Sequence, residues 1–107
     1  MLMVSMRKIQ EVGRRIGREF HPDRVVLFGS HAEGTATDDS DVDLLVVLPF
    51  DGRGFRKSLE ILNRLDVRFP CDLIARRPED VDRQYEQGDP LIREALDRGR
   101  VLYERHS

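Results

Sequence analysis

Residues 25–49 read Val-Val-Leu-Phe-Gly-Ser-His-Ala-Glu-Gly-Thr-Ala-Thr-Asp-Asp-Ser-Asp-Val-Asp-Leu-Leu-Val-Val-Leu-Pro, two apolar runs on either side of a polar loop. The first run, residues 25–28, is short and β-branched, which predicts a buried strand. The second run, from about residue 41 to 48, predicts another strand. We therefore expect a strand, a polar loop and a second strand at the centre of an α/β fold.

The polar loop begins with Gly29 and Ser30. Glycine takes backbone angles that are closed to other residues, so the chain can turn sharply there and bring its N–H groups close to a ligand. Ser30 adds a small hydroxyl that can cap a following helical turn or bond a phosphate oxygen. This corner is therefore a candidate phosphate-binding site.

The loop ends with two acids, Asp41 and Asp43. Because side chains alternate along a strand, one face is expected to carry both acids and the other to be apolar: Asp41, Asp43, Leu45 and Val47 against Val42, Leu44, Val46 and Leu48. Neighbouring carboxylates repel each other and are costly to bury without a partner. Mg²⁺ relieves both problems, since it prefers a few carboxylate oxygens together with substrate phosphates. The pattern indicates phosphoryl or nucleotidyl transfer, and the alternative is a capped turn followed by solvated acids.

Gly29-Ser30, ten intervening residues and Asp41-x-Asp43 resemble the signature of the nucleotidyltransferase superfamily related to DNA polymerase β. The longer pattern, Gly-Ser-His-Ala-Glu-Gly and then Ser-Asp-Val-Asp-Leu, is most similar to the minimal nucleotidyltransferases. These small domains are often encoded beside a HEPN partner in toxin–antitoxin pairs. Their third position is often Arg or Tyr, where this chain has His31, and residues 99–104 are similar to the family's usual ending. The resemblance implies a small mixed β-sheet flanked by helices.

The resemblance also implies a third carboxylate on a neighbouring strand. The candidate is Asp72, within the run Phe-Pro-Cys-Asp-Leu-Ile-Ala of residues 69–75. A lone charge in an apolar run is unexpected in a core strand and is a functional hint. Its structural alternative is a strand-edge acid paired with an arginine. Asp66 in a helical segment and Asp51 in a loop are weaker candidates.

By this resemblance, the reaction uses Mg²⁺, two ions being expected, and ATP as the substrate. Asp41 and Asp43 would share both ions, which lie about 4 Å apart in two-metal sites. Asp72 would hold the ion beneath the acceptor hydroxyl and can accept its proton. Gly29 and Ser30 would bind the β- and γ-phosphates. The chain has neither a P-loop motif nor a Rossmann glycine motif.

Length and charge limit the possible partners. At 107 residues the chain is expected to be a single domain spanning residues 1–107, too small for the extra domains of larger relatives. The acceptor is therefore expected to come from a partner, by the resemblance a HEPN-family protein. The net charge of −2 gives no global field that attracts nucleic acid. Residues 1–8 are too short in apolar length for a signal or membrane segment, so a cytoplasmic location is expected.

The rest of the chain predicts an α/β scaffold. A helix from about residue 3 to 20 would present an apolar face opposite a basic one that we expect to be solvated: Ile9, Val12, Ile16 and Phe20 against Arg7, Lys8, Arg14, Arg15 and Arg18. A second helix would face the sheet with Phe55, Leu59, Leu62 and Leu65. A third would begin at Asp89-Pro90 and end at Gly99, before a short strand over residues 101–103. Cys71 is the single cysteine and is expected to pack in a strand.

Three functions remain open from the sequence. The first is an enzyme that transfers AMP, or another NMP, to a hydroxyl of a partner, in HEPN pairs a tyrosine of the toxin. The second is a non-catalytic module that neutralises its partner by contact. The third is a small-molecule transferase resembling the aminoglycoside enzymes, which the absence of a second domain disfavours. Three acids at the expected positions favour the first over the second, because a pure binder has no physical need for mutually repelling carboxylates. His31 is expected either to contact a phosphate as a cation or to pack as a neutral ring.

Overall fold

Four strands and five helices lie along residues 4–106, the part of the chain that this computed structural model describes. The elements in order are α1 (Met6–Phe20), β1 (Arg24–Phe28), α2 (Ser30–Glu33), β2 (Val42–Val47), α3 (Gly54–Leu65), β3 (Cys71–Arg76), α4 (Pro78–Glu86), α5 (Pro90–Arg98) and β4 (Arg100–Glu104). None of these helices is long and apolar enough to cross a membrane.

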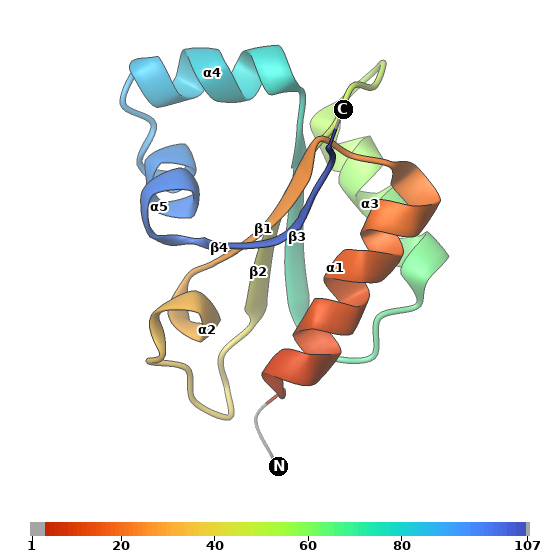
Figure 1. The fold of residues 1–107 in the computed structure, drawn as a ribbon, viewed down its shortest axis with the longest axis vertical. Helices are drawn as coiled ribbons and strands as arrows, with labels where there is room; N and C mark the ends of the chain where they lie inside the picture. The colour runs from red at the N-terminus through yellow and green to blue at the C-terminus, as the bar shows by residue number, and fades with distance from the viewer. Residues whose placement is uncertain (1–3, 107) are drawn as a thin grey trace.

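The strands form one mixed sheet in the order β3-β2-β1-β4. β1 pairs antiparallel with both β2 and β4, whereas β2 pairs parallel with β3. A parallel pair needs a crossover connection, and α3 supplies it. β3 is thus a terminal strand, next to β2 alone (Figure 1). The expected small mixed sheet flanked by helices is confirmed.

Helices cover both faces of the sheet (Figure 1). α1 and α3 pack on one face, over a core that includes Val42, Leu44, Val46 and Leu48. α4 and α5 pack on the other face, over a smaller core that includes Val26, Phe28, Leu45 and Val47. The alternation expected for the second strand is therefore confirmed, and Asp43 lies on the α4 and α5 face.

The first helix begins at Met6 rather than near residue 3, because Ser5 is its N-cap: Ser5 Oγ accepts a hydrogen bond from the Lys8 N–H at 3.3 Å. Residues 1–3 lie outside the described part of the chain. The helix ends at His21, whose left-handed backbone (φ 48°) forms the C-cap. β4 crosses α1 so closely at Gly17 that a Cβ there would collide with the Tyr103 ring.

The face predicted for α3 is confirmed for Leu65, which is buried, and for Leu62, which packs against the core, but it is wrong for Phe55 and Leu59. The helix turns Ser58, Ile61 and Leu65 inward, while Phe55 is 75% exposed and Leu59 43% exposed. Ser58 can face the sheet because its hydroxyl is satisfied there. It donates to Gly54 O at 2.9 Å and accepts from the Ala75 N–H at 3.0 Å.

The end of the chain contains one helix that was predicted and one that was not. α5 begins as expected, with Asp89 Oδ1 accepting from the N–H groups of Leu91 and Ile92 at 3.0 and 3.1 Å, and it ends at Gly99. α4 was not predicted. It buries Val81 as its one fully buried residue, so its sequence carries little helical periodicity.

Candidate active site

Two candidate acids are direct neighbours across the parallel pair of strands. Asp43 of β2 is in register with Asp72 of β3, and paired residues of adjacent strands project to the same face of a sheet. The Val42 N–H donates to Pro70 O at 2.9 Å, which holds the two strands together where both begin. Asp41 lies two residues before Asp43 and is exposed.

The apolar neighbours of Asp72 are typical of a core strand, but Asp72 lies on a strand at the edge of the sheet. It is exposed, because β3 is a terminal strand and alternate positions of that strand face solvent. Within residues 4–106 it also forms no ion pair with an arginine. The acid is therefore accessible to an incoming group.

The glycine corner directly adjoins these acids. Phe28, the last residue of β1, is in register with Asp43, and Gly29 follows with φ 75° and ψ −157°. A Cβ at this position would collide with Asp43 Oδ2. Gly29 is the N-cap of α2, and Ser30 is the first helical residue. Ser30 therefore does not cap the helix, and its hydroxyl makes no hydrogen bond within the described residues 4–106.

Negative charge is concentrated at this end of the sheet (bottom of Figure 1). Burial raises the pKa of Asp43, and the charges of Asp72, Asp41 and Glu94 raise it further, while His31 lowers it. Burial, followed by the same three aspartates, raises the pKa of Cys71 to about 12. That thiol is neutral near pH 7 and packs against the core, as expected for a structural cysteine.

Residues 6–102 match the family model described as "Nucleotidyltransferase domain". This chain belongs to that family. No curated protein matches the sequence, so the family and the solved structures carry the comparison.

Three solved structures share the fold of this nucleotidyltransferase domain. A putative nucleotidyltransferase from Sulfolobus solfataricus aligns with a TM-score of 0.65 at 21% identity, covering 94% of this chain and 80% of that one. A toxin–antitoxin with AMP-PNP aligns with a TM-score of 0.58 at 19% identity, and the alignment covers 91% of this chain and 74% of that one. A mutant of the toxin–antitoxin MntA-HpeT aligns with a TM-score of 0.53 at 15% identity, and the alignment covers 96% of this chain and 75% of that one. The resemblance noted in the sequence is confirmed at the level of family and fold.

His31 connects the glycine corner of the nucleotidyltransferase domain to the acids. The imidazole is only 9% exposed, and its Nε2 lies 3.2 Å from Ser40 O, directly before Asp41. Thr37 N–H also donates to Ser40 Oγ at 2.9 Å. His31 is therefore a packed ring that holds the far end of the loop, and its contact with a phosphate stays a prediction.

Glu94 is the third acid that acts on Asp43, and it was not predicted from the sequence. α5 carries it over the acid-bearing face of the sheet, where Ile92 and Ala95 pack into the smaller core. No motif marks this position. The one signal in the sequence was an acid between the apolar positions Ile92 and Ala95 of an amphipathic helix.

The donor set of the nucleotidyltransferase domain fits magnesium. Within the described residues, no three His, Cys, Asp or Glu side chains converge tightly enough to enclose an ion. However, the three aspartates offer hard carboxylate oxygens, and two of them are in register. Burial first, and then repulsion by the neighbouring acids, raises the pKa of Asp43, and a bound cation would offset both. Asp41, Asp43 and Asp72 are therefore suitable Mg²⁺ ligands.

Proposed function

We propose that this domain is a Mg²⁺-dependent protein adenylyltransferase. In this proposal it moves AMP from ATP to a tyrosine hydroxyl of a HEPN-type partner toxin, and so acts as an antitoxin in the cytoplasm. The observation that carries the proposal is the register of Asp43 with Asp72 directly beside the Gly29 corner. It brings a metal-binding acid, an accessible acid and a phosphate-binding backbone to one end of the sheet.

The structural neighbours support a nucleotide substrate and a protein partner. Two of the three are toxin–antitoxin proteins, and one of these was solved with AMP-PNP, a non-hydrolysable analogue of ATP. The exposure of Asp41 and Asp72 is compatible with a macromolecular acceptor, because both acids are open to a large incoming partner.

The proposed reaction assigns one task to each group. The acceptor oxygen attacks the α-phosphorus of ATP, the bond from that phosphorus to the pyrophosphate oxygen breaks, and the hydroxyl proton leaves. The Gly29 N–H and the Ser30 hydroxyl bind the β- and γ-phosphates. Asp72, exposed on β3, orients the acceptor hydroxyl and accepts its proton. Asp41, Asp43 and Asp72 would hold Mg²⁺, which supplies charge neutralisation for the phosphates.

The test is AMP transfer to the purified HEPN-type protein encoded beside this chain. After incubation with ATP and Mg²⁺, intact-mass spectrometry should show the partner heavier by one or more AMP groups. Asp72→Asn should abolish the mass increase and leave complex formation intact, because the shape is kept and the charge is lost. Asp82→Asn is the matched control, since Asp82 is an exposed acid of α4 that lies outside the proposed site. A partner that is fully inhibited yet unmodified would favour the contact-only module.

A further inference from the structure

The flank of α3 that faces away from α1 carries exposed apolar side chains that the proposed chemistry does not use. Phe55, Leu59 and Leu62 recur at the spacing of one helix face. Phe55 is 75% exposed and Leu59 43% exposed. We refer to these three side chains as the α3 stripe. Leu62 is partly buried and packs against the core, so Phe55 and Leu59 form the exposed part of the stripe. Single exposed apolar residues are ordinary, but these two are neighbours on one helix face and adjoin Leu62.

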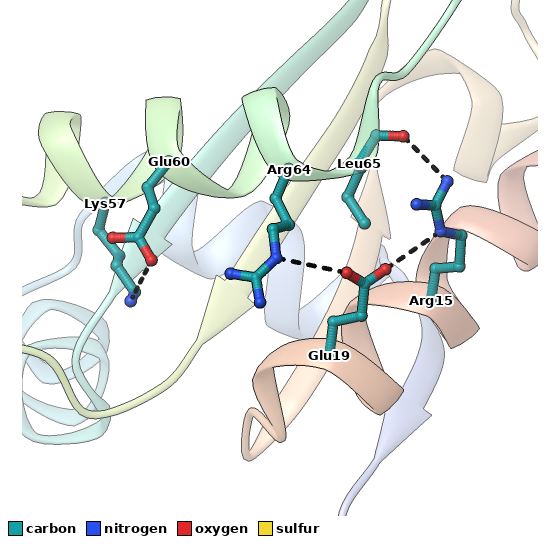
Figure 2. A network of polar contacts seen from close by, with 6 residues as sticks. All are labelled: Arg15, Glu19, Lys57, Glu60, Arg64 and Leu65. Carbon is teal, nitrogen blue, oxygen red and sulfur yellow. Dashed lines mark hydrogen bonds and ion pairs between the residues drawn. The ribbon is translucent and has the colours of Figure 1, made fainter.

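The opposite flank of α3 is charged and already occupied. Arg64 Nε lies 3.6 Å from Glu19 Oε1 of α1, and Lys57 Nζ lies 3.2 Å from Glu60 Oε2 within α3 (Figure 2). Lys57 and Arg64 also lie over the ring of Phe20, the last residue of α1. α1 therefore covers one flank of α3 and leaves the stripe uncovered by the neighbouring helix.

The α3 stripe leads toward the acids. Its last residue, Leu62, lines a cavity of about 310 Å³ at the end of α3, and Cys71 lines the same cavity. Cys71 directly precedes Asp72 on β3, the strand at the free edge of the sheet. A molecule lying along the stripe would thus reach the strand that carries the acceptor-side acid.

The charges beside the stripe indicate what it binds. Arg53 and Arg56 flank Phe55, both are exposed, and neither forms an ion pair with another residue of the described chain. Unpaired guanidinium groups next to an aromatic side chain favour an acidic, apolar partner surface. The surface that three side chains and one cavity can bury is also small compared with the area of an obligate interface. That size suits a partner that dissociates after transfer better than a permanent second copy of this chain.

We propose that the α3 stripe and the adjoining cavity are the docking surface for an amphipathic helix of the acceptor protein. The helix carries acidic residues beside its apolar face and lies along α3. From there the acceptor segment passes around the free edge at β3 to reach Asp72, which projects from the opposite face of the sheet to Cys71 and α3. This inference rests on the proposed function, because it assumes a protein acceptor. It adds the surface that selects that acceptor.

The test compares Phe55→Glu and Arg56→Glu with the native chain, using the same purified HEPN-type partner. Titration calorimetry should show the Kd for the partner rising about tenfold or more for Phe55→Glu, as for a buried aromatic anchor. Arg56→Glu should weaken binding most at low salt, where exposed charges are least screened. Val101→Glu is the matched control, because Val101 is an apolar residue, 53% exposed, on the opposite edge strand. It should leave the Kd unchanged, and thermal melts should confirm that all three variants fold.

The outcomes separate this inference from the proposed function. Binding that depends on Phe55, without AMP transfer by the native chain, would support the docking surface and overturn the proposed function. Transfer with an unchanged Kd in both α3 variants would overturn the docking surface alone. Self-association that Phe55→Glu abolishes, with partner binding unchanged, would assign the stripe to a second copy and also overturn the inference. A native chain that neither binds nor modifies the partner would overturn both.

Discussion

The backbone of Gly29 lies so close to the Asp43 carboxylate that no side chain fits between them. Its positive φ of 75° disfavours any other residue as well. The backbone proposed to bind phosphate and the acid proposed to bind metal can lie this close together only because residue 29 has no Cβ. The contact therefore links the two functions that the sequence placed at opposite ends of one loop.

Gly29→Val should impair nucleotide binding more than Ser30→Ala. The valine adds bulk against Asp43 and strains the backbone, whereas the alanine removes one hydrogen bond to a charged group, worth about 1.5–3 kcal/mol. Titration calorimetry with Mg·ATP on both folded variants gives the ranking. A larger loss for Ser30→Ala would show that the hydroxyl, not the backbone, dominates phosphate binding.

Asp43→Asn should stabilise the metal-free domain near neutral pH. The folded state raises the pKa of Asp43 above 3.8, so between that value and the raised pKa the folded chain binds more protons than the unfolded chain. The free energy of unfolding therefore falls as the pH rises through this window, and the asparagine variant escapes that loss. Urea denaturation in EDTA at acidic and neutral pH should show the advantage growing with pH.

The same experiment has two internal checks. Asp51→Asn, an exposed acid in the loop before α3, should show no such advantage. Added Mg²⁺ should stabilise the native chain and not the Asp43→Asn variant. Equal stability of native chain and variant across the pH range would contradict the electrostatic account.

His31→Ala should destabilise the domain by about 1–3 kcal/mol, because it leaves a cavity and removes the hydrogen bond to Ser40 O. It should also weaken Mg·ATP binding, since the loop that ends at Asp41 loses its attachment to α2. His31→Gln, which retains a side-chain N–H donor, should recover part of both losses. Recovery of neither would show that ring packing alone accounts for the residue.

Gly17→Ala should be destabilising, although Gly→Ala in a helix usually stabilises by up to about 1 kcal/mol. The new methyl group would collide with the Tyr103 ring and force β4 away from α1, at a typical overpacking cost of about 1–3 kcal/mol. Gly17→Ala in a Tyr103→Leu background should cost less. Thermal or urea denaturation of the three variants measures the coupling.

The elements that could be predicted from the sequence are those whose pattern is local. Alternation predicted the two faces of β2, and the Asp89 cap with Pro90 predicted α5. The inward face of α3 could be predicted only in part, because Ser58 is buried through partners supplied by Gly54 and Ala75, while Phe55 and Leu59 turn outward. Local pattern also could not show that β3 is a terminal strand, and hence that Asp72 is exposed. The same limit applies to Glu94, which only tertiary packing brings near Asp43.

The strand order has a consequence for dynamics. β1 and β2 have neighbours on both sides, whereas β3 has β2 alone. Local opening costs least where a segment makes the fewest contacts, and native-state hydrogen exchange reports that cost amide by amide. The amides of β3 should therefore exchange faster than those of β1. The acid assigned to the acceptor hydroxyl is then carried by an edge strand that opens more readily than the central strands, and it can adjust to a bound substrate while Asp43 stays fixed on the central strand β2.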